Sequence, residues 1–223
     1  MPETLTRSQL AGSTREPLLA DTIGQAFDKT AARYPDACAL VVRHQAIRWS
    51  YSEYQREIDR LACGLLALGL QPGDRVGIWA PNCYEWCLTQ FATAKMGAVM
   101  VCINPAYRLH ELEYALNKVQ CKALIAAAGF KSSDYLGMLQ QLAPELSSCA
   151  AGALQAAALP ALRMIIRMGS AASEGMYNFA HVCAMGGDVQ RRQLAAPPAT
   201  PRAPPSHTGI FSTTASLSAT ACG

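Results

Sequence analysis

The sequence has few charges, no long apolar run and no charge cluster of one sign. Charged residues make up 16% of its 223 residues, and the formal net charge is only +3. No Lys/Arg cluster with interleaved aromatics is present, which excludes a dedicated nucleic-acid surface. No apolar run reaches the roughly 18–20 residues of a membrane span, and the opening MPETLTRSQL lacks the apolar core of a signal peptide. We therefore expect an intracellular protein, cytoplasmic or mitochondrial, that binds no nucleic acid.

The cysteines form no recognisable framework. There are nine of them, an odd number, and no CxxC occurs. Several stand at core positions, which is typical of reduced cysteine used as a small hydrophobic residue. Cys83 and Cys87 have a CxxxC spacing, but no second pair or nearby His completes a set of ligands. We therefore predict no metal site.

What the sequence does contain is an alternation of strand and helix patterns between Leu70 and Ala128. Three short apolar runs alternate there with two segments of helical periodicity. The runs are 75–80, 99–103 and 123–127, and the helical segments are 84–96 and 109–119. Two consecutive βαβ units of this kind predict a parallel sheet with covering helices, an α/β fold. Asn82 is the expected cap of the first helix, whose Trp86, Phe91 and Ala94 would face the sheet.

The flanking segments add further elements on each side of this stretch. Before it we expect a helix from Ile23 capped by Asp21 or Thr22, a hairpin of 37–42 with 47–50, and a helix 52–69 capped by Ser50 or Ser52. After it we expect a helix 132–142 capped by Ser132 or Ser133, a helical extension 150–159, a strand 162–168 and a loop 169–187.

A few polar residues stand where a ligand could bind. Asn104 follows the second strand at the edge where open parallel sheets bind ligands, yet Asn-Pro is also a strong turn signal, and the turn interpretation is favoured. His44 is expected in a solvated turn. His181 and Cys183 are interpreted as local packing. The doublet before Asp188 lacks the Lys and Ser/Thr of a phosphate loop.

From Ala195 onward the composition changes. The last 29 residues hold 7 Ala, 5 Pro, 5 Thr and 4 Ser, with no acid and no Lys. Such a composition is typical of a disordered tail. We divide the chain into an N-terminal extension (1–20), a folded domain (21–187) and a disordered tail (188–223).

Several segments of the sequence carry a resemblance to a known family. They are DTIGQAFDKTAARYPDACALVV, then WSYSEY, then GDRVGIWAPN, GAVMVCINPAYR and ELEY. Together they resemble the N-terminal region of AMP-forming acyl-CoA synthetases, the superfamily that includes luciferases and peptide-synthetase adenylation domains. The likeness covers roughly residues 20–187 and is greatest to the medium-chain fatty acyl-CoA synthetase branch. No GxGxxG occurs, so a nicotinamide-binding interpretation has no support.

The resemblance implies an ATP-dependent fatty acid–CoA ligase, which forms an acyl-adenylate and then acyl-CoA. A complete member would use ATP, Mg and coenzyme A. The Ser/Thr/Gly-rich loop ending in Pro-Lys, the ribose-binding Asp and the C-terminal Lys of that family are not found, so the fold expected is an incomplete N-terminal domain. We expect no cofactor in this chain, name no catalytic residue, and leave cofactor-binding residues open. Trp86, Phe91 and Tyr107 are candidate acyl-pocket aromatics for which a core role is favoured.

Three interpretations of the chain follow. It is a truncated and inactive ligase, a non-catalytic module that binds acyl ligands or proteins, or the product of a gene-model error that never folds stably. The residues indicate no particular oligomeric state. One hypothesis for the tail is a shifted reading frame, because codons for Phe211 to Ser216 and Pro204 to Thr208 permit family-like Asn-Asn and Leu-Ser-His in another frame.

Overall fold

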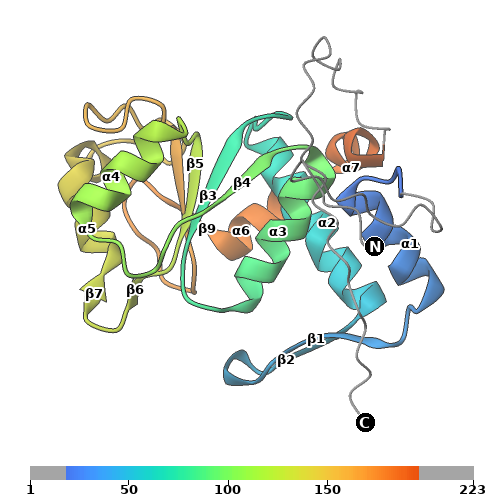
Figure 1. Cartoon of the computed structure of the whole chain (residues 1–223). Helices are drawn as coiled ribbons and strands as arrows, with labels where there is room; N and C mark the ends of the chain where they lie inside the picture. Colours follow the sequence, from blue (N-terminus) through green and yellow to red (C-terminus); the bar gives the residue numbers. More distant parts are fainter. Residues whose placement is uncertain (1–18, 196–223) are drawn as a thin grey trace, which may run out of the picture.

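The computed structural model describes residues 19–195, and its centre is a parallel sheet with helices on both faces (Figure 1). The five strands lie in the order β4-β3-β5-β8-β9. Their bounds are Arg75–Trp79 (β3), Val99–Cys102 (β4), Ala123–Ala126 (β5), Met164–Arg167 (β8) and Tyr177–Asn178 (β9). Every neighbouring pair in this sheet is parallel. The α/β prediction is confirmed.

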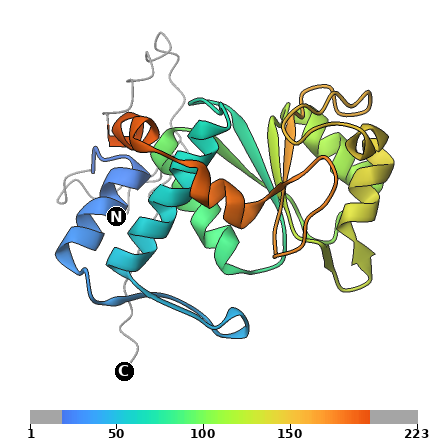
Figure 2. The same cartoon turned by 180° about the vertical axis from the view of Figure 1, so that it is seen from behind.

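The helices form a layer on each side of the sheet (Figures 1 and 2). One side carries α2 (Tyr51–Ala67), α3 (Tyr84–Met96) and α6 (Phe179–Met185), and the other carries α4 (Leu109–Lys118) and α5 (Tyr135–Leu142). Beyond α2 and α3 lie α1 (Ile23–Arg33) and α7 (Asp188–Ala195). Among the helices of residues 19–195, none has the length and apolar character needed to cross a membrane.

The central strands are buried on both faces, as β5 shows. Ala123 and Ile125 belong to the core under α2, α3 and α6, whereas Leu124 and Ala126 belong to the core under α4 and α5. Successive side chains of a strand point to opposite faces. Since helices cover both, β5 is a continuous apolar run rather than an alternating one.

Two small antiparallel pairs lie outside the main sheet. Strands β1 (Cys38–Val42) and β2 (Ile47–Ser50) form the predicted hairpin, joined by a 3-10 turn, η1 (Arg43–Gln45). Strands β6 (Gly129–Phe130) and β7 (Ser133–Asp134) form a shorter one before α5. A second 3-10 turn, η2 (Pro144–Ser147), follows α5.

The ends of the first two helices were correctly predicted from their capping residues. Thr22 caps α1 in a capping box with Gln25, and Ser50 caps α2 in a capping box with Glu53. In each box the cap side chain accepts from the backbone N–H of the third helical residue, and the side chain of that residue accepts from the backbone N–H of the cap. Gly69 follows α2 with a φ of +83°, the left-handed conformation that ends helices.

Other helix predictions were wrong. Asp134, not Ser132 or Ser133, caps α5, because its carboxylate accepts from the N–H of Gly137 at 3.0 Å. Residues 150–159 form turns and irregular chain instead of a helical extension. There Leu154 and Leu159 are buried against the α4–α5 layer. Tertiary packing therefore overrides the helix propensity of the alanines in this segment.

The segment after β8 holds more structure than the predicted loop and tail. It contains β9 and α6, and helix α7 occupies the first eight residues assigned to the tail. Phe179 and Val182 of α6 are buried. The remainder of the tail, 196–223, lies outside the described residues, as do 1–18.

Helices α2 and α6 meet at a glycine. A Cβ added to Gly64 would lie 1.9 Å from the carbonyl oxygen of Val182. Only a residue without a side chain permits that approach. The contact fixes α6, and through α6 the adjoining strand β9.

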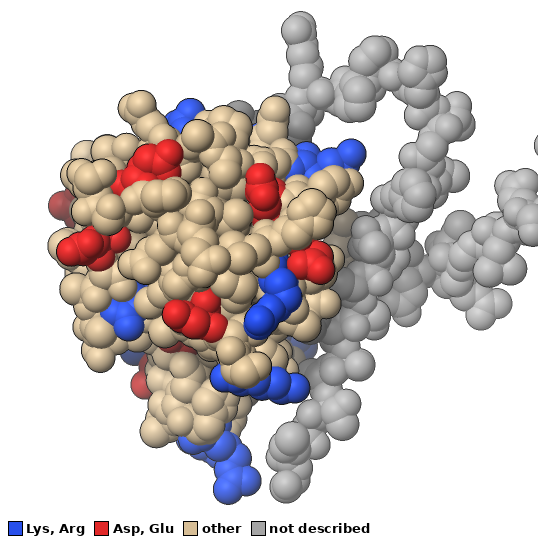
Figure 3. All heavy atoms as spheres, turned by 90° about the vertical axis from the view of Figure 1, so that its left-hand side faces the viewer, with Lys and Arg blue, Asp and Glu red and all other residues tan. Residues whose placement is uncertain are grey.

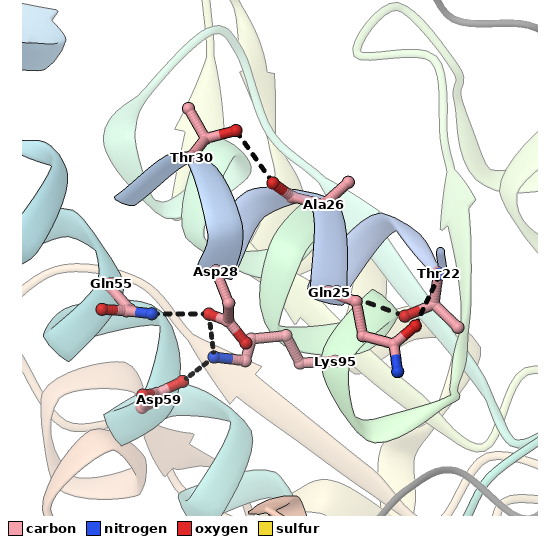
Figure 4. A network of polar contacts seen from close by, with 8 residues as sticks. All are labelled: Thr22, Gln25, Ala26, Asp28, Thr30, Gln55, Asp59 and Lys95. Atoms are coloured by element: carbon pink, nitrogen blue, oxygen red, sulfur yellow. Dashed lines mark hydrogen bonds and ion pairs between the residues drawn. The ribbon is translucent and has the colours of Figure 1, made fainter. Parts of the chain in front are cut away.

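A polar cluster joins α1, α2 and α3 (Figure 4). The Lys95 amine, whose side chain is 9% exposed, lies 2.7 Å from a carboxylate oxygen of Asp28 and 2.5 Å from one of Asp59. Gln55 donates to the same Asp28 oxygen at 2.6 Å. Burial raises the pKa of Asp59, while Lys95 opposes that rise. Two carboxylates from different helices thus compensate one buried amine.

Candidate functional site

The strand order identifies one edge of the sheet as the candidate site. From β3 the chain moves to β4 on one side and then returns past β3 to β5 on the other. Adjacent strands whose connections leave in opposite directions define a topological switch point, here between β3 and β5. Ligands of open parallel sheets bind outside the carboxyl ends of the strands at such a point.

A pair of stacked aromatic rings supports this edge. Trp79, the last residue of β3, stacks on Tyr135 with ring centroids 3.6 Å apart and planes 9° apart. The indole N–H donates to the Asn104 carbonyl at 3.2 Å, and the Tyr135 hydroxyl donates to the Pro105 carbonyl at 2.5 Å. Both rings are fully buried. They fasten the loop after β4 to the end of β3 and to α5, a role that the sequence did not reveal.

Asn104 has the structural role that its Asn-Pro context indicates. Its side-chain oxygen accepts from the N–H of Ala106 at 2.9 Å, inside its own turn. The residue is exposed at the carboxyl edge. The side chain therefore shapes the turn rather than reaching toward a ligand.

The start of α3, which follows β3 at the switch point, is capped from far away in the sequence. Asn82 was the predicted cap, and this prediction was wrong: Cys83 holds the cap position and makes no capping bond. Instead Gln45, at the tip of the β1–β2 hairpin, accepts from the N–H of Tyr84 at 2.7 Å and donates to Glu85 at 2.9 Å. The hairpin thus positions the turn that leaves β3.

The three aromatics considered for an acyl pocket are not brought together. Trp86 is half-buried and donates to the Ala80 carbonyl at 3.3 Å. Phe91 packs on Phe27 of α1, with centroids 4.6 Å apart, so it faces α1 and not the sheet as predicted. Tyr107 is 36% exposed on the β4–α4 loop. No aromatic contact joins them in the described residues, and Trp86 and Phe91 serve the core.

The cysteines and histidines near this edge offer no nucleophile or ligand set. Burial raises the pKa of Cys83 to about 12, with Glu85 adding to the rise, and burial also raises the pKa of Cys87. Protonated thiols are poor nucleophiles and poor metal ligands. His44 and His181 are exposed. Within residues 19–195 no three His, Cys, Asp or Glu side chains gather where they could hold a metal ion.

The described residues do not fit an ATP–Mg site. Gly186 and Gly187 lie between α6 and α7, not between a strand and a helix, and the Gly187 N–H is taken by Gln190 at 3.0 Å. Phosphate loops need a strand–helix turn with Lys and Ser/Thr. Since a set of metal ligands and a phosphate loop are both missing from residues 19–195, no catalytic step can be derived from these residues.

The surface shows where else a ligand could bind. A hollow of about 290 Å³, lined by Gln155, Ala156, Pro160 and Arg163, lies near the start of β8, at the opposite edge from the switch point. On the face seen in Figure 3, Lys and Arg are interspersed with Asp and Glu. Because the hollow lies away from the topological switch point and the charges on this face are of mixed sign, the carboxyl edge remains the candidate site.

Comparison with known proteins places the chain among adenylate-forming ligases. Residues 27–205 match the family model described as AMP-binding enzyme. The chain is 45% identical over 163 residues to the mitochondrial medium-chain acyl-CoA ligase ACSF2 of Danio rerio, covering 73% of this chain and 27% of the relative. It is 44% identical over 159 residues to the Homo sapiens protein of that name, covering 71% and 26%. The chain therefore spans about a quarter of the curated relatives' length.

The fold comparison agrees. The fatty acyl CoA synthetase of Mycobacterium tuberculosis superposes with a TM-score of 0.59 at 23% identity, covering 74% of this chain and 28% of that one. At this level of identity the likeness shows a shared fold. The sheet and its covering helices are thus similar to the N-terminal part of a larger ligase.

Proposed function

Since this chain belongs to the AMP-binding enzyme family, we propose that it supplies the first sheet of an ATP-dependent medium-chain fatty acid–CoA ligase. The observation that carries the proposal is the 45% identity, over 73% of the chain, to a medium-chain acyl-CoA ligase. Residues 21–187 would be the domain in question. The proposed partners are a fatty acid, ATP with Mg, and coenzyme A, all acting on the complete ligase.

The same proposal assigns no adenylation activity to the 223-residue chain alone. In the family's reaction a carboxylate attacks the α-phosphorus of ATP, and donors must hold the reacting groups in line. The described residues offer no phosphate loop and no group of metal ligands. What they do offer is rigid support for the strand ends, through Trp79, Tyr135 and the cap from Gln45.

An exchange assay tests the inactivity. The chain is incubated with ATP, Mg, labelled pyrophosphate and fatty acids of six to twelve carbons, and label entering ATP is measured. We expect none above a blank without protein. Exchange that depends on the fatty acid would overturn this part of the proposal.

A chimera tests the positive part. Residues 20–187 replace the matching segment of the Danio rerio relative, and octanoyl-CoA formation is measured. We expect an active enzyme, since the two sequences share 45% identity across the matched segment. The control is the same chimera with Trp79→Ala, which should lose activity together with folding stability. A chimera that folds cooperatively but forms no acyl-CoA contradicts the proposal and favours a non-catalytic module.

We extend the proposal to a mitochondrial location, in preference to the cytoplasm. The support is that both relatives compared above carry "mitochondrial" in their names. Expression of the full chain with a C-terminal tag, followed by protease protection in isolated mitochondria, tests it. A tagged chain found only in the cytosolic fraction would contradict it.

A further inference from the structure

Arg167 ends strand β8 at the carboxyl edge of the sheet and has an incomplete set of hydrogen bonds. Its Nη1 donates to the carbonyl of Ala172 at 3.1 Å. Its Nε is buried and has no acceptor among the described residues. None of the ion pairs within residues 19–195 includes Arg167. The side chain as a whole is only partly buried, and its Nη2 is neither hydrogen-bonded to a described residue nor among the buried unpaired atoms.

A second arginine has a carbonyl acceptor for each of its three guanidinium nitrogens. Arg75, at the start of β3, donates from Nε to Val119 at 2.8 Å, from Nη1 to Gly73 at 3.1 Å and from Nη2 to Gln120 at 3.3 Å. Each acceptor is a backbone carbonyl. An unpaired buried donor costs on the order of 1–3 kcal/mol. Arg167 differs from Arg75 in that only one of its guanidinium nitrogens, Nη1, has an acceptor among the described residues.

The loop beside Arg167 is rich in unbonded donors. Residues 169–175, sequence GSAASEG, connect β8 to the chain before β9. Four of the loop's carbonyls accept hydrogen bonds: Asn178 donates to Gly169 at 2.6 Å and to Ala171 at 3.4 Å, Arg167 donates to Ala172, and the Met176 N–H donates to Ser173. In contrast, the described residues offer no acceptor to the backbone N–H groups of 170–175.

Two further features of the loop suit a ligand. Gly169 has a φ of +86° with open space where a Cβ would stand, so no side chain obstructs this end of the loop. Ser170 and Ser173 add hydroxyl groups to the backbone donors. Glu174 is the single acid of the segment; it is exposed and makes no ion pair with Arg167 in the described structure.

We propose that Arg167 and residues 169–175 form a phosphate-binding subsite at the carboxyl end of β8. A phosphate oxygen would accept from the Arg167 Nη2, which has no hydrogen-bond partner among the described residues and is not buried, and neighbouring oxygens would accept from the loop's N–H and hydroxyl groups. Guanidinium binds such oxygens bidentately, and successive backbone N–H groups bind anions. A phosphate presents more terminal oxygens than a carboxylate, which matches a donor set of this size.

This inference rests on the proposed function for the source of the phosphate. Both ATP and coenzyme A carry phosphate groups, and the shared chemistry is a phosphate with free terminal oxygens. The experiment therefore uses three probes with the full 223-residue chain: pyrophosphate alone, coenzyme A, and octanoate. Calorimetry measures the affinity of each.

The variants are Arg167→Gln, Arg167→Lys and the matched control Arg163→Gln, which changes an exposed arginine just before the same strand. We expect Arg167→Gln to weaken pyrophosphate binding about tenfold or more, as the loss of charged hydrogen bonds implies. Arg167→Lys should weaken it less, and Arg163→Gln should leave it within about twofold. If coenzyme A binding falls as well while octanoate binding does not, coenzyme A is the ligand; if only pyrophosphate responds, the nucleotide triphosphate is.

Three outcomes overturn the subsite. They are wild-type binding of pyrophosphate by Arg167→Gln, an equal loss in Arg163→Gln, and an effect on octanoate alone. Denaturation midpoints of the variants, measured alongside, show whether a loss of binding reflects unfolding. The chimera assay reports on the ligase assignment independently, so an active chimera with no phosphate effect would reject the subsite and keep the proposed function.

Discussion

The two edges of the central sheet are built differently, although the same strands run through both. At the amino edge, Arg75 gives every guanidinium nitrogen to a carbonyl, and Lys122 lies 2.7 Å from a carboxylate oxygen of Asp74. At the carboxyl edge, Arg167 retains an unpaired donor beside a loop of unbonded N–H groups.

The two edges differ in how fully their arginines are hydrogen-bonded. Polar groups at the amino edge bind one another and leave little for a ligand. The carboxyl edge is held together by two buried aromatic rings, Trp79 and Tyr135, and the Arg167 guanidinium there is incompletely paired. This division agrees with the rule that ligands bind at the carboxyl ends of parallel strands.

The largest expected effect comes from removing the aromatic support. Trp79→Ala should lower the free energy of unfolding by about 4 kcal/mol, the loss typical of a buried Trp. Urea denaturation followed by circular dichroism measures it. A loss below about 1 kcal/mol would mean that the stacked rings do not hold the carboxyl edge.

The next effect lies at the amino edge. Arg75→Gln leaves the carbonyls of Val119, Gly73 and Gln120 without their donor and should cost about 2 kcal/mol, since water replaces only part of these bonds. Arg163→Gln serves as the control, because the side chain of this exposed arginine bonds only to the carbonyl of Leu162, at 3.4 Å. Equal losses of unfolding free energy in the two variants would show that the Arg75 hydrogen bonds contribute no more to stability than the single bond of Arg163.

Tyr135→Phe tests one hydrogen bond without disturbing the stack. The phenylalanine ring can still lie on Trp79, but the Pro105 carbonyl loses its donor, at a cost of about 1 kcal/mol. The same denaturation curves provide the measurement. A loss as large as that of Trp79→Ala would show that the hydroxyl, not the stacking, holds the loop after β4.

A pH experiment probes the buried thiol beside Arg75. Burial raises the pKa of Cys121 to about 11, and its Sγ donates to the carbonyl of Ala123 at 3.0 Å. A raised thiol pKa means that its contribution to stability is complete below the ordinary thiol pKa and is lost as pH rises toward 11. From pH 9 to 10 the wild-type chain should lose about 1 kcal/mol more than Cys121→Ala. Parallel stability curves for the two proteins would contradict this.

The smallest effect on stability is expected at Arg167. Because Arg167→Gln removes one bond to Ala172 and also an unpaired buried donor, the free energy of unfolding should change by less than about 0.5 kcal/mol. A loss comparable with that of Arg75→Gln would mean that both edges use arginine structurally, and the contrast between them would fail.

Much of the fold could be read from local patterns. The capping boxes at Thr22 and Ser50, the left-handed stop at Gly69 and the three apolar runs each depend on residues near in sequence. The parallel sheet followed from their alternation with helices. Helix α6, by contrast, was missed because its seven residues carry too short a pattern and form against α2 at Gly64.

The candidate site was less predictable. The carboxyl edge was expected from the sheet class, and Asn104 was placed there, but its role in its own turn was the one favoured. Arg167 and the loop after it carried no motif. Their proposed role depends on which of their hydrogen-bond donors remain unpaired after folding. The unpaired donors can be identified only in the folded structure, where all neighbouring residues are in place.

Sequence alone determined the class of fold and the family, because apolar periodicity and a long matched segment are properties of the chain itself. Tertiary structure decided which polar groups are hydrogen-bonded to other residues and which have no partner among the described residues. Gln45 caps a helix that begins 39 residues later, and Arg75 meets carbonyls 44 and 45 residues away. Such pairings are set by the packing of distant segments, so the contrast between the two edges of the sheet appears only in the folded protein.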